Sequence, residues 1–211
     1  MDRRELLKLI ALATGSVVIG GELFLTGCTN GPSIGGPSFN ADDIAFLDEV
    51  GETILPKTKS PGAKEAEIGR FMEIMVNDTY DKNNQKIFHA GIGKLNDACK
   101  KKFDTDFIKA TPQQRTELLV GLDKEARDYQ KEKSEFDKEQ NKKAAAEKEK
   151  GNNDYTKETR PTHYFTLMKQ LTMLGFFTSK PGATMALRHE AVPGKYDGDF
   201  PYKKGDRAWA E

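Results

Sequence analysis

Histidines and closely spaced acidic residues are the side chains of this 211-residue sequence that could bind a metal. The three histidines, His89, His163 and His189, stand far apart, and none has partners at zinc-site spacing. We therefore expect them in surface or helix-capping positions. Asp197-Gly198-Asp199 is typical of the start of a calcium loop, but Phe200-Pro201 interrupts the alternation of oxygen ligands that such a loop requires.

Cofactor and nucleophile motifs give no enzyme signature either. Gly91-Ile92-Gly93 lacks the third glycine of a dinucleotide-binding loop and lies within a helical pattern. No Ser or Cys has a recognisable nucleophile motif around it, and a c-type haem would need Cys-x-x-Cys-His. The sequence thus predicts no catalytic, cofactor-binding or metal-binding residues in this chain.

Cys28 is the residue with the clearest chemical role. It ends Leu25-Thr26-Gly27-Cys28, which resembles the lipobox of bacterial lipoproteins, where a diacylglycerol group is attached to the thiol. The apolar stretch before it is too short and too glycine-rich for a comfortable membrane-spanning helix. We expect residues 1–27 to be a signal peptide and Cys28 to carry lipid; a buried cysteine near an N-terminal helix is the alternative.

The basic residues in front of that stretch resemble a twin-arginine export motif. Arg3 and Arg4 form the pair and Lys8 closes it, although Asp2 stands where Ser or Thr is usual. Twin-arginine export carries folded cargo, whereas an ordinary secretory signal would also show basic residues. We favour the twin-arginine route, and expect lipid anchoring on the periplasmic side of a bacterial membrane, inner or outer.

Composition limits the partners. The sequence has 33 basic and 33 acidic residues, and this balance argues against nucleic acid. Once Cys28 is lipidated, Cys99 is the only cysteine left, so no intrachain disulfide can form. Cys99 recurs with Ile92 and Leu95 at helical spacing, which predicts a buried, inert thiol rather than a reactive or intermolecular one.

Apolar periodicity predicts an all-α domain over residues 39–211, with about five to six helices and an irregular Pro/Gly-rich C-terminal tail. Residues 28–38 are rich in Gly, Pro and Ser and are typical of a flexible tether. Helical segments are expected from Asn40, from near Ile68, from about Asn83, after Thr111-Pro112, and from Thr162.

The stretch of about residues 124–153 departs from this pattern because it consists mostly of Lys, Glu, Asp and Gln. Either a solvated helix supported by ion pairs or a disordered insertion fits this composition, and we favour the helix. A basic membrane-binding helix is disfavoured by the mixed signs of charge.

Aromatic residues near the C-terminus are the best candidates for binding a partner. Rings set among Gly and Pro are typical of interface anchors, although these could instead cover the domain's own core. The candidates are Phe176, Phe177, Pro193, Gly194, Tyr196 and Trp209.

Several blocks together resemble subunit 3 of the gluconate 2-dehydrogenase family. They are Glu52-Thr53-Ile54-Leu55-Pro56, Ser60-Pro61-Gly62-Ala63, Leu174-Gly175-Phe176-Phe177-Thr178-Ser179, Pro181-Gly182-Ala183, Val192-Pro193-Gly194-Lys195-Tyr196-Asp197-Gly198 and Arg207-Ala208-Trp209. The resemblance covers about residues 40–211 apart from the charged stretch. It implies a flavoprotein partner that oxidises a sugar or sugar acid with FAD, and often a cytochrome c subunit with haem c.

In such a complex the small subunit would carry no cofactor, would escort the flavoprotein through the membrane, and would stabilise and tether it. The lipobox departs from the family pattern, because a free periplasmic subunit would not need one, and it suggests that lipid on Cys28 is the anchor. A free-standing structural or carbohydrate-binding lipoprotein is the alternative, and an enzyme acting alone has the least support.

Overall fold

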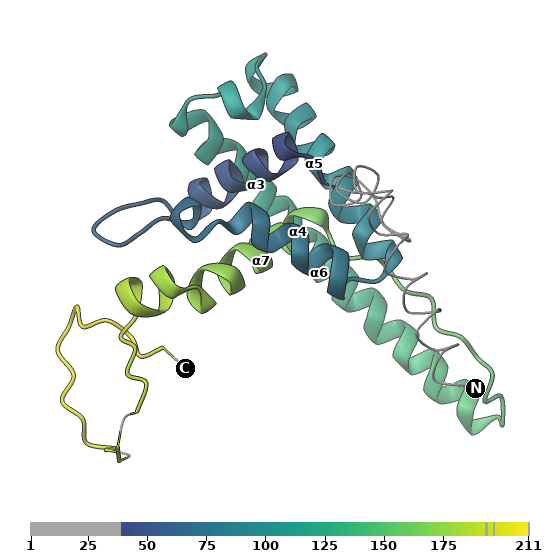
Figure 1. Ribbon diagram of the computed structural model, residues 1–211. Coiled ribbons are helices and arrows are strands. Elements are labelled where there is room, and N and C mark those ends of the chain that lie inside the picture. The colour runs from purple at the N-terminus through teal and green to yellow at the C-terminus, as the bar shows by residue number, and fades with distance from the viewer. Residues whose placement is uncertain (1–38, 193, 196, 211) are drawn as a thin grey trace, which may run out of the picture. The chain divides into compact units, whose positions relative to one another are not determined.

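The computed structural model describes residues 39–192, 194–195 and 197–210 (Figure 1). The predicted signal peptide and tether, with Arg3, Arg4 and Cys28, lie outside the described residues. Within them the chain forms five α-helices and three short 3-10 or π turns, and its one β-type contact is an isolated bridge between Arg188 and Trp209. The all-α prediction is confirmed.

The elements follow one another with short connections. In chain order they are α3 (Ala41–Ile54), η2 (Ala63–Ala66), α4 (Ile68–Thr79), α5 (Lys82–Phe103), η3 (Phe107–Lys109), α6 (Pro112–Glu149), α7 (Tyr164–Thr178) and η4 (Gly182–Ala186). Each helix expected from the sequence is present.

Local capping explains where these helices begin. Asn40 accepts from the Asp43 backbone N–H, and the Asp43 carboxylate accepts from the Asn40 N–H in return, which closes a capping box at α3. Thr111 and Gln114 form the same arrangement at α6, with proline at the first helical position. Asp81 caps α5. These caps satisfy backbone donors that have no partner inside the helix.

Helix α7 is the centre of the core and contacts α3, α4, α5 and α6 (Figure 1). It buries more residues than any other described helix: Phe165, Leu167, Met168, Leu171, Thr172, Gly175 and Phe176. Glycines let its neighbours approach closely. A Cβ at Gly175 would lie 2.5 Å from Phe71 Cδ1 of α4, and one at Gly91 of α5 would lie 2.7 Å from Tyr164 Cβ.

A polar network holds α3 against α6 at the edge of the core. The Arg115 guanidinium forms an ion pair with Glu49, and its Nε donates to the Phe107 carbonyl at 2.9 Å. Lys64 also pairs with Glu49. Opposite charges around Glu49 outweigh its partial burial, so the pKa of this carboxyl is lowered despite the desolvation that opposes the shift.

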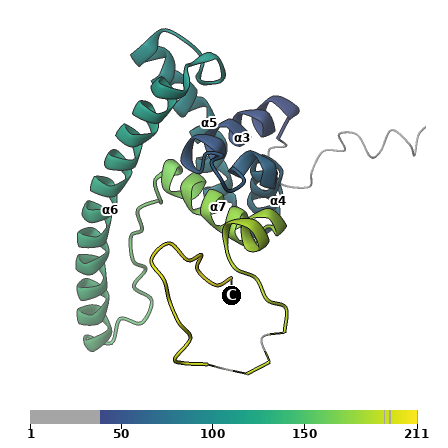
Figure 2. The same cartoon turned by 90° about the vertical axis from the view of Figure 1, so that its left-hand side faces the viewer.

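Helix α6 continues far beyond the helical body (Figure 2). Its first half buries Leu118, Leu119, Leu122 and Ala126, and we call its second half, residues 127–149, the arm. The charged stretch is therefore helical up to Glu149, and Gly151, with φ +83°, follows it. Ion pairs one helical turn apart, Lys133–Asp137 at i,i+4 and Lys131–Asp128 at i,i+3, lie on the arm, as the helical alternative predicts.

The chain returns along the arm as a non-helical segment, residues 152–163 (Figure 2). Individual side-chain contacts, rather than a buried hydrophobic core, join the arm to this return segment. The Arg160 guanidinium lies 4.3 Å from the Phe136 ring centroid, and the Tyr129 hydroxyl donates to the Pro161 carbonyl at 2.9 Å. No helix in the described part of the chain combines the length and apolar character needed to cross a membrane.

Candidate partner-binding surface

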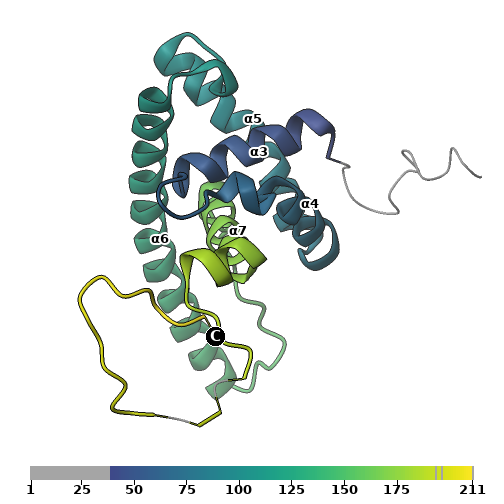
Figure 3. The same ribbon diagram turned by 60° about the vertical axis from the view of Figure 1, so that its left-hand side comes forward.

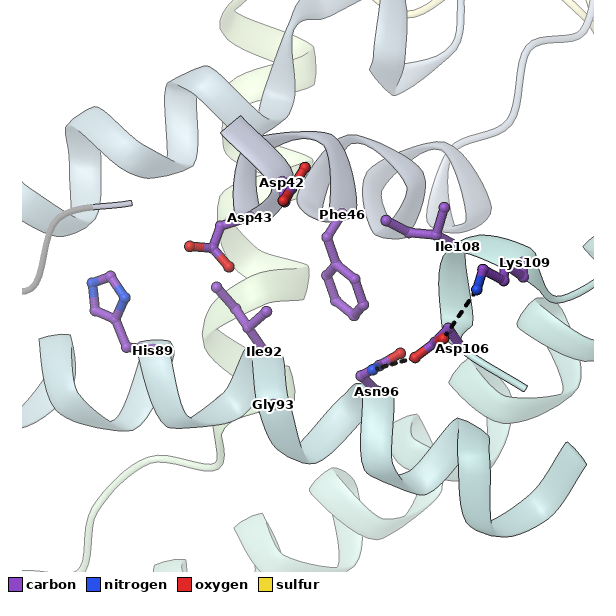
Figure 4. A pocket seen from close by; sticks show the side chains of 10 residues that line it. All are labelled: Asp42, Asp43, Phe46, His89, Ile92, Gly93, Asn96, Asp106, Ile108 and Lys109. Atoms are coloured by element: carbon purple, nitrogen blue, oxygen red, sulfur yellow. Dashed lines mark hydrogen bonds and ion pairs between the residues drawn. The ribbon is translucent and has the colours of Figure 1, made fainter. Parts of the chain in front are cut away.

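A cleft of about 490 Å³ lies between α3, α5 and the η3 turn (Figure 4). Phe46, Ile92 and Ile108 give it apolar walls, and Asp42, Asp43, Asp106 and Lys109 surround them. Asn96 Nδ2 donates to Asp106 Oδ1 at 2.9 Å, and Lys100 pairs with Asp106 at 3.0 Å. These contacts lower the pKa of Asp106 and hold its carboxylate in place.

His89 stands at one end of this cleft (Figure 4). Its ring lies 4.2 Å from the Phe39 ring centroid, and its Nε2 is buried without a hydrogen-bond partner. His89 is half-buried rather than fully at the surface, because its ring packs against Phe39. Burial lowers the pKa of His89, with Asp43 opposing the shift.

The other sequence candidates for chemistry have structural or solvent-exposed positions. His163 Nδ1 accepts from the Phe165 N–H and caps α7, and His189 is exposed, as expected. Asp197 Oδ1 accepts from the Asp199 N–H within the same turn. Cys99 is fully buried, and burial raises the pKa of its thiol, which agrees with an inert role. Among the described side chains, no cluster of three His, Cys, Asp or Glu could hold a metal ion.

The two aromatic candidates on α7 differ in position. Phe176 is buried in the core at 3% exposure, so its side chain is not at the surface where a partner could contact it. Phe177 is half-buried and packs edge to face on Phe176, with ring centroids 5.2 Å apart. Nearby on α7, Met173 and Leu174 are exposed apolar residues.

Beyond η4 the chain forms a wide loop that returns to its own start (Figure 3). The Arg188 N–H donates to the Ala208 carbonyl and the Ala210 N–H donates to the Arg188 carbonyl, each at 2.8 Å. We call residues 188–209 the C-terminal loop. Gly194 lies in it with φ +75°, whereas Pro193 and Tyr196 lie outside the described residues.

Aromatic side chains gather where this loop closes. Phe200 and Trp209 meet edge to face with ring centroids 5.5 Å apart, and the Arg188 guanidinium lies 5.4 Å from the first and 4.7 Å from the second. Trp209 is 45% exposed and Phe200 48%. Both residues lie outside the buried core cluster, so this part of the tail does not cover the domain's core.

Sequence reasoning missed Arg188 and Arg207 as parts of this surface. Arg207 Nη1 donates to the Met185 carbonyl at 2.8 Å and the Thr184 carbonyl at 3.2 Å, and thereby joins the end of the loop to η4. Each arginine contacts residues about twenty positions away along an irregular part of the chain. Hydrophobic periodicity predicts only contacts within regular elements, so it could not reveal these.

Comparison with protein families decides the identity of the domain. The family model described as gluconate 2-dehydrogenase subunit 3 matches residues 41–194. The chain belongs to the gluconate 2-dehydrogenase subunit 3 family. Members of this family are accessory subunits that associate with a dehydrogenase complex.

The subunit 3 match begins at the first residue of α3 and spans all five helices, including the arm, and ends at Gly194. The final block expected from the sequence resemblance, Arg207-Ala208-Trp209, lies beyond the matched residues. No curated protein and no solved structure matches the chain.

Proposed function

We propose that this subunit 3 protein is a non-catalytic accessory subunit that escorts, stabilises and tethers an FAD-dependent sugar or sugar-acid dehydrogenase. The family match carries the proposal, because it gives the chain an accessory role beside a dehydrogenase. All five helices of the body lie within the residues that the family model matches.

The N-terminal sequence supplies the escort and tether parts of the proposal. Arg3 and Arg4 would direct twin-arginine export, so that the folded flavoprotein crosses the membrane with this subunit. Lipid on Cys28 would then hold the complex on the periplasmic side of the membrane. FAD would reside in the large subunit and haem c, where present, in a cytochrome c subunit.

The binding surface in this proposal lies at the C-terminal end of the chain. Phe177, Gly194 and Trp209 are its described members, together with Pro193 and Tyr196 of the same segment. Exposed aromatic rings bury much area at low entropic cost when a partner covers them, which suits an anchoring surface.

Export of the dehydrogenase tests the escort role. In cells carrying Arg3→Lys and Arg4→Lys together, dye-linked sugar dehydrogenase activity should disappear from the periplasmic side and flavoprotein should accumulate in the cytoplasm. Arg127→Lys on the exposed arm is the matched control and should leave export unchanged. Normal export of the dehydrogenase in the double variant would disprove the escort role.

A further inference from the structure

The C-terminal loop is long and irregular, yet both of its ends are fixed. Its first residue, Arg188, is bound through the backbone to Ala208 and Ala210, and Arg207 is bound to the carbonyls of η4. Loops of this length without secondary structure are uncommon in small domains and are usually either functional or linker segments. Closing such a loop costs chain entropy, so the contacts at its base must supply compensating free energy.

The Arg188 side chain makes the central contact of that base. Its guanidinium lies within 5.4 Å of the ring centroids of both Phe200 and Trp209, and the two rings also contact each other. A guanidinium beside aromatic rings is attracted by the negative charge of the ring faces. Because Phe200 and Trp209 lie outside the core, their contacts with Arg188 stabilise the closed loop rather than the helical body.

Between its fixed ends the loop presents exposed side chains. Among the described residues from His189 to Tyr202, the Asp199 N–H donates to Asp197 Oδ1 at 3.1 Å. Val192 and Tyr202 are 80% and 76% exposed. Exposed apolar and aromatic side chains on a loop with fixed ends are features of a surface that anchors a partner.

We propose that Arg188 is a positioning residue that holds the C-terminal loop closed, and that the closed loop binds the dehydrogenase through its exposed apolar and aromatic side chains. The second half of this statement rests on the proposed function. Holding the loop closed before binding lowers the entropy lost when the partner docks, and so raises the affinity.

Trp209 is the only tryptophan of the chain and reports on the loop directly. In the full-length protein, Arg188→Ala should shift Trp209 emission to longer wavelength and increase its quenching by acrylamide, because the ring loses its neighbour. Arg188→Lys should restore part of the difference. Arg160→Ala removes an equivalent contact, with Phe136 on the arm, and should leave the spectrum unchanged. An unchanged spectrum in Arg188→Ala would overturn the positioning role.

Binding is measured with the flavoprotein that co-purifies with the tagged wild-type chain and is identified by its flavin absorbance. Arg188→Ala should weaken this interaction on the order of tenfold, Arg188→Lys less, and Arg160→Ala not at all. The thermal unfolding of the helical body, followed by circular dichroism, should be the same in all variants because Arg188 lies outside the core.

The outcomes separate the two proposals. If the wild-type chain captures a flavoprotein and Arg188→Ala captures it with equal affinity, the loop is not the docking element, although the accessory function stands. If the wild-type chain captures no flavoprotein, the proposed function fails and docking by the loop fails with it, while the fluorescence result still decides whether Arg188 holds the loop closed.

Discussion

At the scale of single residues, His89 is the buried polar group whose burial is least compensated. Its Nε2 is enclosed without a partner, and desolvation lowers the pKa of the ring. The unfolded chain, with a histidine pKa of about 6.5, therefore takes up a proton before the folded chain does. The contribution of His89 to stability is fully present above that pH and is lost as the pH falls toward the lower folded pKa.

His89→Phe should remove this pH dependence. Phenylalanine keeps the packing against Phe39, has no proton to take up and leaves no unpaired nitrogen. Between about pH 7 and about pH 5, the free energy of unfolding in urea should fall less in the variant than in the wild type. Parallel losses in the two proteins would contradict the assignment, and His189→Phe is the matched control because that side chain is exposed.

Residue-level predictions from the sequence succeeded where the cause is local. The capping box of Asn40 and Asp43 spans one turn, and both partners are visible in the sequence. Phe176 and Phe177 show the opposite case, because they are adjacent and chemically identical. Only the packing of the other helices around α7 makes the first a core residue and leaves the second half-exposed.

At the scale of elements, the approach of α5 to α7 depends on a glycine. Gly91 and Gly93 lie two residues apart on α5, yet a Cβ at Gly91 would meet Tyr164 Cβ at 2.7 Å, while one at Gly93 would have nothing within 4 Å. Tyr164 Cβ is attached to the backbone and cannot move without shifting the start of α7.

The two glycine-to-alanine substitutions should therefore have opposite effects on stability. Gly91→Ala should lower the free energy of unfolding by about 1–3 kcal/mol through overpacking. Gly93→Ala should raise it by roughly 0.5–1 kcal/mol, because glycine is a poor residue in a helix interior. Chemical denaturation of the two variants measures this difference, and equal effects would show that helix propensity alone governs both positions.

The helices were predictable because their apolar faces repeat with helical spacing, but their contacts were not. The arm illustrates the limit: its composition suited either a solvated helix or disorder, since ion pairs between neighbouring turns contribute only a few tenths of a kcal/mol each. The return segment decides in favour of the helix by adding contacts such as Arg160 with Phe136. Those partners lie 24 residues apart along the chain, so no short sequence pattern reveals them.

At the scale of the whole molecule, export and tethering are separable in the proposed function, since Arg3 and Arg4 would serve the first and Cys28 the second. Cys28→Ala should leave the dehydrogenase exported but release it, together with this subunit, into the soluble periplasmic fraction. Fractionation followed by dehydrogenase assay measures the result. Activity that stays with the membrane, in a variant whose signal peptide has been shown by mass spectrometry to be removed, would show that another subunit supplies the anchor.

The arm and the return segment lie side by side, so a change in the length of one requires a change in the length of the other. A helix rises about 1.5 Å per residue, whereas the returning chain advances up to roughly 3.3 Å per residue. Hydrogen bonds such as those of Gln140 with Tyr155 and of Asn141 with Lys157 fix which residues of the arm lie beside which residues of the return segment. Two additional helical turns would therefore need only about three more residues in the return segment. Among homologous chains, insertions in these two segments should occur together, in a ratio of about two to one.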